Sequence, residues 1–177
     1  MRIVAGRFKG RRLVAPSGKA TRPTSDRVRE SLFGVIGASV EGARVLDLFA
    51  GSGALGLEAL SRGAAAAVLV DRSPRAIAAI RANLETLGVD ADVRLMEARA
   101  ALRTAAARRE AYDLVFVDPP YRHAAGLGRE LSGALAPVLA PAARLVTESD
   151  RRDPIALDLP LGDERRYGDT IIRIHDT

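Results

Sequence analysis

Apolar and polar residues follow two alternating periods along most of the chain. From Ala43 onward, short apolar runs are separated by longer segments with apolar residues at every third or fourth position. The short runs predict buried strands, and the longer segments predict amphipathic helices. This strand–helix alternation predicts an α/β fold with a doubly wound, mostly parallel, Rossmann-like sheet. The expected strands cover residues 43–50, 66–71, 91–97, 112–118 and 143–149, and the expected helices 54–62, 73–88, 98–109 and 125–140.

The two ends of the chain predict further elements. Residues 2–16 alternate loosely around glycines, which predicts an arm resembling a β-hairpin. Residues 25–37 predict a helix with Ser25 as its N-cap and Gly37 as its stop. Residues 165–176 predict a strand pair that completes a seven-stranded sheet. We expect a basic N-terminal arm over residues 1–25 and a single globular domain over residues 26–177.

Composition narrows the class of protein. Of the 177 residues, 47% are hydrophobic and 28% are charged, as in ordinary globular domains. The absence of cysteine excludes disulfides, thiolate metal sites and a cysteine nucleophile. The two histidines, His123 and His175, argue against a zinc site. Because no apolar run is long enough to cross a bilayer, we expect a soluble, cytoplasmic protein, in the simplest case a monomer.

The positive charge is concentrated at the N-terminal end. Residues 1–29 hold nine of the 27 Lys and Arg but one of the 22 Asp and Glu, a local charge of +8 in a chain of net +5. This placement indicates that a polyanion binds there. A solvated basic tail, or arginines in structural salt bridges, is the alternative. The candidate RNA-binding residues are Arg7, Lys9, Arg11, Arg12, Arg22, Arg27 and Arg29.

The segment after the first expected strand has the glycine spacing of a nucleotide-binding loop. Gly51, Gly53 and Gly56 stand between a strand and a helix, and Asp71 ends the next strand, where a carboxylate can bind ribose hydroxyls. The pattern also fits NAD, and a glycine-rich turn without a ligand is a further alternative. Asp47 favours S-adenosyl-L-methionine, because a carboxylate there repels a pyrophosphate but pairs with an ammonium group.

The tetrapeptide DPPY, Asp118 to Tyr121, ends the fourth expected strand. The apolar run 114–117 suits a strand buried on both faces, and Pro119 and Pro120 cannot continue it. Ligands bind at such carboxyl ends in open α/β sheets. With a methyl donor nearby, the Asp118 carboxylate and the Pro119 carbonyl can hold an exocyclic amine in line with the methyl group, while Tyr121 stacks on the base. A proline-stiffened turn with a capping aspartate is the alternative.

These motifs together resemble those of a known family. The glycine loop and DPPY resemble the class I S-adenosylmethionine-dependent amino-methyltransferases. A more specific likeness, to the RsmD-type 16S ribosomal RNA (guanine-N2)-methyltransferases, spans residues 2–174 and is carried by RIVAGRFKGRRL, TRPTSDRVRESLF, DLFAGSGALGLEALSRGA, VFVDPPY and RRYGDT. The resemblance implies N2-methylation of a guanine in the P-site hairpin loop of 16S rRNA, with the assembled 30S subunit as substrate.

The motifs and the resemblance assign the candidate site residues. One departure from the family concerns the acid that follows the third strand and meets the adenine amino group. LMEARAAL places Ala98 or Arg99 there, so we expect Glu97 to substitute through a register shift, or backbone atoms to serve instead. We expect His123 to be a bystander and Tyr167 to lie in a turn. The candidate cofactor-binding residues are Asp47, Phe49, Gly51, Gly53, Gly56, Asp71, Arg72 and Glu97, and the candidate catalytic residues are Asp118, Pro119, Pro120 and Tyr121.

Other functions remain open. A DNA adenine-N6 methyltransferase can have the same catalytic tetrapeptide, but such enzymes carry a target-recognition domain for which this chain has no room. A protein-glutamine methyltransferase more commonly has asparagine at the position of Asp118, and a nonenzymatic RNA-binding assembly factor has no need of intact Asp47, Asp71 and Asp118. A cytosine-C5 methyltransferase is excluded, because it needs a cysteine.

Overall fold

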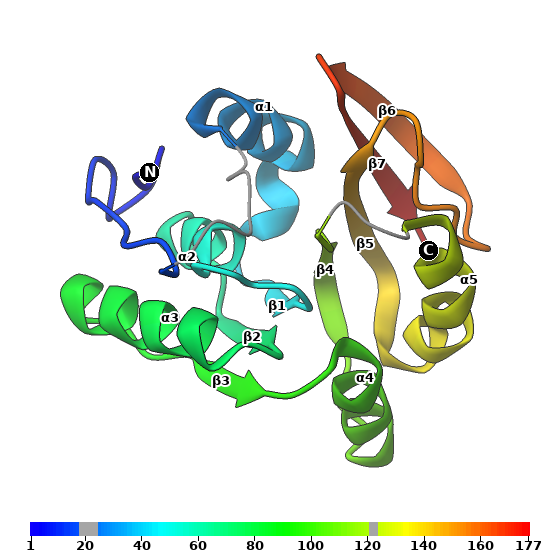
Figure 1. Cartoon of the computed structure of the whole chain (residues 1–177), viewed down its shortest axis with the longest axis horizontal. Helices are drawn as coiled ribbons and strands as arrows, with labels where there is room; N and C mark the ends of the chain where they lie inside the picture. Colours follow the sequence, from blue (N-terminus) through cyan, green and yellow to red (C-terminus); the bar gives the residue numbers. More distant parts are fainter. Residues whose placement is uncertain (18–24, 121–123) are drawn as a thin grey trace.

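A computed structural model describes residues 1–17, 25–120 and 124–177 of the chain (Figure 1). Arg22, Tyr121 and His123, which the sequence placed near RNA or the catalytic corner, lie outside the described residues.

The described residues form a seven-stranded sheet in the order β3-β2-β1-β4-β5-β7-β6. The first five strands are mutually parallel, and β7 runs antiparallel between β5 and β6. The strand order reverses between β1 and β4, which makes their carboxyl ends the topological switch point. The predicted doubly wound, mostly parallel sheet is therefore confirmed. The strands are β1 Arg44–Asp47, β2 Ala66–Asp71, β3 Asp92–Leu95, β4 Tyr112–Val117, β5 Leu139–Asp150, β6 Leu161–Tyr167 and β7 Thr170–Asp176.

Helices cover both faces of the sheet (Figure 1). One core cluster joins the arm, α1, α2 and α3 to one face, and a second cluster joins α4 and α5 to the other. The central strand β4 contributes Leu114 and Phe116 to the first cluster and Val115 and Val117 to the second. This arrangement confirms that the apolar run before DPPY is buried on both faces. The helices are α1 Asp26–Ile36, α2 Ala54–Ser61, α3 Pro74–Leu87, α4 Ala98–Ala107 and α5 Ala124–Leu135, with 3₁₀ turns η1 Gly37–Val40 and η2 Ala136–Val138.

The helices α1 and α3 begin or end at the capping residues that the sequence predicted. The Ser25 hydroxyl accepts the Val28 N–H at 3.3 Å, and α1 stops at Gly37, whose φ of +60° favours glycine. The helix α3 ends at Gly88 in the left-handed conformation, with φ of +64°. None of the helices within the described ranges is both long and apolar enough to cross a membrane.

The basic N-terminal arm, residues 1–17, is folded back on itself and docked on the domain. A single antiparallel bridge pairs Arg2 with Arg12, so the segment resembles a hairpin without forming two full strands. Ile3 and Leu13 are buried in the core cluster shared with α1, α2 and α3. The basic side chains therefore extend from a segment that packs against the core, and not from a solvated tail.

Candidate active site

Four carboxylates stand in a row along the carboxyl edge of the parallel sheet. Asp47 and Asp71 are the last residues of β1 and β2, Asp118 directly follows β4, and Glu97 follows β3 by two residues. Because the strands are adjacent in the order β3-β2-β1-β4, the acids follow the order Glu97, Asp71, Asp47, Asp118 across the switch point. The sequence placed all four at strand ends, and the topology brings them to one edge.

The glycine loop after β1 adopts a backbone that needs glycine. Gly51 and Gly53 have φ of +56° and +80°, a region that side-chain-bearing residues rarely adopt. Gly56 lies inside α2, and a Cβ there would meet Leu69 Cδ2 of β2 at 2.2 Å. The first two glycines therefore shape the turn, and the third lets α2 pack closely against the sheet.

Asp71 fixes the shape of this loop from the neighbouring strand. Its Oδ2 accepts the Gly51 N–H at 2.9 Å, and its Oδ1 accepts the Ser73 N–H at 2.8 Å. The carboxylate is half-buried, so the remaining lone pairs of its oxygens can accept further hydrogen bonds from a ligand. Asp71 thus stabilises the conformation of the glycine loop and is also one of the four acids in the row.

Asp47 is the most buried acid of the row, with 1% of its surface exposed. Its Oδ2 accepts the Gly56 N–H at 3.2 Å, while its Oδ1 has no hydrogen-bond partner among the described residues. Burial, together with the nearby charge of Asp71, raises the pKa of Asp47 to about 7, although the N–H groups of Gly56 and Phe49 act in the opposite direction. A buried acceptor without a partner is a suitable place for a ligand N–H group.

Glu97, assigned from the sequence to the adenine contact, lies between β3 and α4. The strand β3 ends at Leu95 and α4 begins at Ala98, so the acid directly after the strand is Glu97 itself, at the N-cap position of α4. Glu97 Oε1 lies 3.7 Å from Arg72 Nη1, and both side chains are exposed. Phe49, also assigned to the cofactor, is half-buried against the second core cluster.

The corner after β4 is rigid and partly exposed. Asp118 is half-buried, Pro119 is buried and Pro120 is exposed. A further acid, Glu148, lies beside this corner: Val117 of β4 pairs in register with Thr147 of β5, which makes Glu148 the β5 residue next to Asp118. Glu148 is 4% exposed. Glu148 was not among the candidate site residues, because it stands within the polar end Thr147–Ser149 of its predicted strand, where no motif marks it.

The predicted RNA-binding residues divide into exposed and buried ones. Arg7, Lys9, Arg11, Arg12 and Arg27 are exposed. Arg29, another candidate RNA-binding residue, is instead buried. Its side chain is fully buried beneath the arm, where it donates to the Arg2 carbonyl and to Asp26 Oδ1 at 2.8 Å.

Buried polar residues of α2 hold the arm in place. Glu58 accepts the N–H groups of Val4 at 2.7 Å and Ala5 at 2.9 Å, and Ser61 accepts the N–H of Phe8 at 3.0 Å through its hydroxyl. Both are buried. These anchors were not among the predicted site residues, although Glu58 is a visible exception in the apolar helix ALGLEALS.

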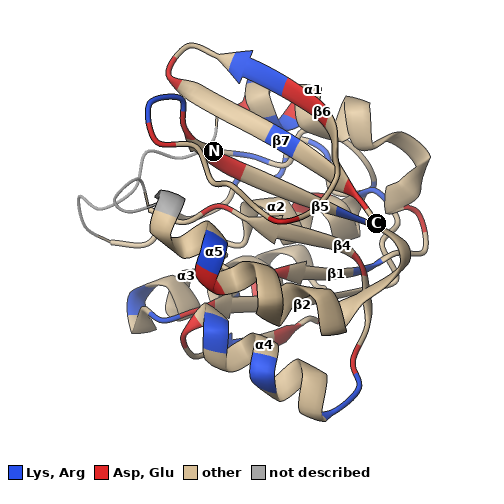
Figure 2. Cartoon of the chain, turned by 90° about the vertical axis from the view of Figure 1, so that its right-hand side faces the viewer, with Lys and Arg blue, Asp and Glu red and all other residues tan. Residues whose placement is uncertain are grey.

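The closing hairpin carries its own charge balance. Figure 2 shows basic and acidic segments side by side on β6 and β7. Arg165 pairs with Asp163 at 2.9 Å, and Glu164 pairs with Arg173 at 3.0 Å. Tyr167, at the end of β6, contacts Ser31 of α1 through its hydroxyl. The hairpin thus lacks the uncompensated positive charge of the arm.

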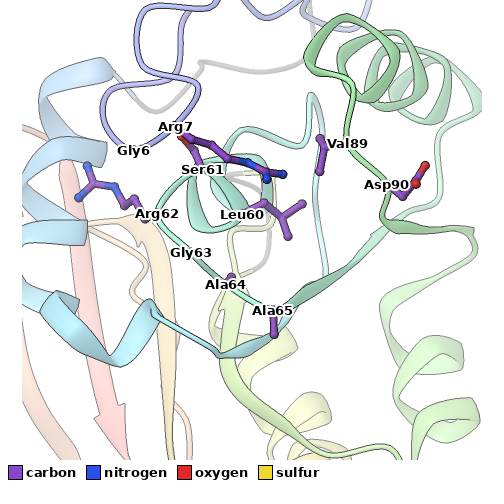
Figure 3. A pocket seen from close by; sticks show the side chains of 10 residues that line it. All are labelled: Gly6, Arg7, Leu60, Ser61, Arg62, Gly63, Ala64, Ala65, Val89 and Asp90. Carbon is purple, nitrogen blue, oxygen red and sulfur yellow. The ribbon is translucent and has the colours of Figure 1, made fainter.

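A hollow of about 560 Å³ lies elsewhere on the molecule (Figure 3). It is bounded by Arg7 of the arm, by residues 60–65 at the end of α2 and by Asp90 after α3. These turns precede β2 and β3, so the hollow is at the amino end of the strands, opposite the row of acids. It is separate from the candidate site.

Comparison with known proteins agrees with this geometry. The family described as "Conserved hypothetical protein 95" matches residues 1–176. A Bacillus subtilis protein named "Putative rRNA methyltransferase YlbH" is 48% identical over 124 residues, which are 69% of this chain and 67% of the relative. The Escherichia coli "Ribosomal RNA small subunit methyltransferase D" is 43% identical over 122 residues, 69% of this chain and 61% of the relative.

A solved structure extends the likeness to the whole fold. The structure titled "Putative methyltransferase yhhF from Escherichia coli" superimposes with a TM-score of 0.84 at 37% identity, covering 99% of this chain and 97% of that one. The curated relatives are matched over only about two thirds of their length, whereas this match is nearly complete. The chain therefore belongs to the family described as Conserved hypothetical protein 95, the RsmD family of class I methyltransferases.

Proposed function

We propose that this chain transfers a methyl group from S-adenosyl-L-methionine to the exocyclic N2 amine of a guanine in 16S rRNA, with the 30S subunit as its substrate. The observation that carries the proposal is the row of four acids at the switch point, beside a glycine loop of the required shape. The names of the relatives, an rRNA methyltransferase and a small-subunit rRNA methyltransferase, support the same reading.

The order of the acids matches the order of polar groups along the cofactor. Neighbouring strands are about 4.8 Å apart, so the two spacings from Glu97 to Asp47 carry the cofactor acids across about 10 Å, and the third spacing brings Asp118 to the far end of the row. In this proposal Glu97 accepts the adenine amino group, Asp71 the ribose hydroxyls and Asp47 Oδ1 the ammonium group. The glycine loop allows the backbone to approach the ligand. When bound, the cofactor supplies an electrophilic methyl group on a sulfonium.

Asp118 and Pro119 hold the acceptor at the other end of the row. The Asp118 carboxylate and the Pro119 carbonyl each accept one N–H of the amine, which aims the nitrogen lone pair at the methyl carbon. The N–CH₃ bond forms as the S–CH₃ bond breaks, and the two acceptors stabilise the positive charge that develops on nitrogen. The product ammonium is acidic and releases its proton to water. No metal and no strong base are required for this chemistry.

Glu148 favours guanine over adenine as the acceptor base. Guanine presents two adjacent kinds of donor on one edge, N1–H and N2–H₂, whereas adenine presents N6–H₂ beside the N1 acceptor. A second carboxylate next to Asp118 can accept the guanine N1–H but would repel the adenine N1 lone pair. The pair of acids at the corner thus argues for a guanine-N2 enzyme over a DNA adenine-N6 enzyme.

The arm supplies contacts to the RNA backbone. Its exposed Arg7, Lys9, Arg11 and Arg12 are mounted on a docked segment and provide the uncompensated charge that a phosphate backbone requires. Phosphate contacts position the nucleic acid, and the catalytic corner reads the base.

Transfer of labelled methyl groups tests the proposal directly. Purified 30S subunits, naked 16S rRNA and DNA are incubated with labelled cofactor, and the products are hydrolysed to nucleosides. We expect N2-methylguanosine from 30S subunits. Recovery of N6-methyladenine from DNA would instead identify the adenine-N6 activity. As a control, Asp118→Ala should abolish turnover while it leaves cofactor affinity nearly unchanged; loss of cofactor binding would mean that Asp118 has been given the wrong role.

A further inference from the structure

One buried side chain joins the arm to the glycine loop. Asn83 of α3 is 0% exposed. Its Oδ1 accepts the Val14 N–H of the arm at 2.7 Å, and its Nδ2 donates both to the Val14 carbonyl at 3.0 Å and to the Ser52 carbonyl at 2.9 Å. Both amide hydrogens and the carbonyl oxygen are therefore engaged, with partners from two different segments.

The Ser52 end of this link lies inside the cofactor loop. Ser52 stands between Gly51, whose N–H binds Asp71, and Gly53, which caps α2. The Ser52 hydroxyl lies 3.6 Å from Met1 Sδ, a second contact with the arm. Ser52 is itself buried, and the Asn83 amide satisfies its carbonyl oxygen. The loop is thus held by Asp71 on one side and by Asn83 with the arm on the other.

The Val14 end belongs to the segment that carries basic residues. Arg11 and Arg12 precede it, and Arg11 also donates to the Thr86 carbonyl of α3 at 2.9 Å. The opposite end of the arm is held separately on α2 by Glu58 and Ser61. Movement of the Arg11–Val14 segment relative to α3 would therefore strain the two bonds between Asn83 and Val14, together with the bond from Arg11 to Thr86, before it affected the other anchor.

We propose that Asn83 is a positioning residue that couples the arm to the cofactor loop, so that RNA on the arm and cofactor at the loop strengthen each other's binding. The inference rests on the proposed function, because it needs the loop to hold the cofactor and the arm to hold RNA. Asn83 touches neither ligand. All hydrogen bonds of the Asn83 amide form in only one relative arrangement of Val14 and Ser52. A ligand that stabilises this arrangement at the arm therefore also stabilises it at the cofactor loop, and the reverse holds as well. Such coupling is reciprocal by thermodynamic necessity.

The composition of the chain provides a direct probe. Asn83 is its single asparagine and glutamine is absent, so a uniformly ¹⁵N-labelled, untagged sample gives one side-chain amide NH₂ pair, from Asn83. We expect S-adenosylhomocysteine alone and a short RNA hairpin alone each to shift this pair, and the RNA to bind more tightly once S-adenosylhomocysteine is present. An NH₂ pair that moves with one ligand but not with the other would overturn the proposal.

A variant tests the role of the donor. Asn83→Asp keeps the size and one acceptor but removes the donor for the Ser52 and Val14 carbonyls. We expect the affinity for S-adenosylhomocysteine to fall about tenfold, the scale of one lost buried hydrogen bond. KM for the cofactor should rise while kcat at saturation is retained, and RNA should no longer strengthen cofactor binding. Thr86→Ala, which removes an exposed hydroxyl bond to the Ala82 carbonyl on the same helix, is the matched control and should change none of these.

The outcomes separate the inference from the proposed function. Unmodified protein that binds neither S-adenosylhomocysteine nor RNA would contradict the proposed function itself. Protein that binds both, with coupling that survives Asn83→Asp, would contradict the role of Asn83 alone. If Asn83→Asp does not fold, the titration of the unmodified protein decides the question without it.

Discussion

The Gly51 N–H donates to Asp71 Oδ2 at 2.9 Å, so the carboxylate that ends β2 holds the loop that follows β1. The other oxygen of Asp71 is engaged by the Ser73 N–H. Asp71 therefore has a structural role before any ligand binds, and its two roles cannot be separated by removing its charge alone.

Asp71→Asn should weaken both the loop and the cofactor site. An amide places an NH₂ group against one of two backbone N–H groups, so one of the two bonds is lost. We expect affinity for S-adenosylhomocysteine to fall by about 10- to 100-fold, the equivalent of about 1.5–3 kcal/mol for bonds to a charged group, and the melting temperature to fall as well. Calorimetric titration and thermal unfolding measure the two effects. Asp90→Asn, at an exposed position away from the site, is the control; an Asp71→Asn protein with unchanged affinity would contradict the assignment.

Cofactor binding should depend on pH through Asp47. Burial raises the pKa of this carboxyl to about 7, while the ligand's ammonium group binds the ionised form. Affinity for S-adenosylhomocysteine should therefore weaken as pH falls below about 7, approaching a tenfold loss per pH unit at most, and binding near pH 7 should release a proton. Titration calorimetry in buffers of different ionisation enthalpy measures that release.

The same raised pKa predicts a trend in the stability of the free protein. Asp47 ionises near its ordinary value of 3.8 when the chain is unfolded but only near 7 when it is folded. Its contribution to stability is thus fully present below about pH 4 and is lost as pH rises toward 7. Asp47→Asn should remove this trend together with the pH dependence of binding. A pH profile that persists in Asp47→Asn would assign the titration to another group.

The sheet and the row of acids could be predicted because both depend on local patterns. A period of two or 3.6 residues identifies each strand or helix. In a parallel sheet, an acid at the carboxyl end of a strand lies at the same edge as the acids that end the other strands, and no long-range contact has to be known to predict this. The strand end near Glu97 was misplaced because DVRLME continues the apolar pattern beyond Leu95, where the pairing with β2 stops.

Residues that act through distant backbone groups could not be predicted in the same way. Glu58 and Asn83 bind arm N–H groups 54 and 69 positions away, and the sequence contains no spacing that relates such partners. The burial of Arg29 could not be predicted for a similar reason. The arm that covers it forms almost no regular secondary structure, and its Arg2 carbonyl lies 27 positions away from Arg29 in the sequence. These contacts of Glu58, Asn83 and Arg29 hold the basic arm against the domain.

Glu148 should affect the RNA step and leave cofactor binding unchanged. Glu148→Gln keeps the shape but removes the charge that would attract the guanine N1–H. We expect kcat/KM for 30S subunits to fall by about 10- to 100-fold, the scale of a hydrogen bond to a charged group, with little change in affinity for S-adenosylhomocysteine. Glu130→Gln on the exposed surface of α5 is the control. An equal loss of cofactor affinity would show that Glu148 supports the fold instead of reading the base.

Arg27 and Arg29, two residues apart on α1, should separate RNA binding from stability. Arg29 is buried and forms hydrogen bonds with Asp26 and with the arm. Arg29→Met should therefore lower the free energy of unfolding by about 2 kcal/mol. This loss is smaller than for a fully buried ion pair, because Asp26 remains partly exposed. Arg27 is exposed, so Arg27→Met should change stability by less than about 0.5 kcal/mol. Denaturant titration measures both values.

The salt dependence of RNA affinity then gives the complementary result. Each phosphate contact contributes about one unit to the slope of log affinity against log salt concentration. Arg27→Met should reduce this slope by about one unit, whereas Arg29→Met, measured well below its melting temperature, should leave the slope unchanged. A flatter slope in Arg29→Met at full folding would mean that the arginine leaves its buried position when RNA binds, and the arm would then have to open to receive its substrate.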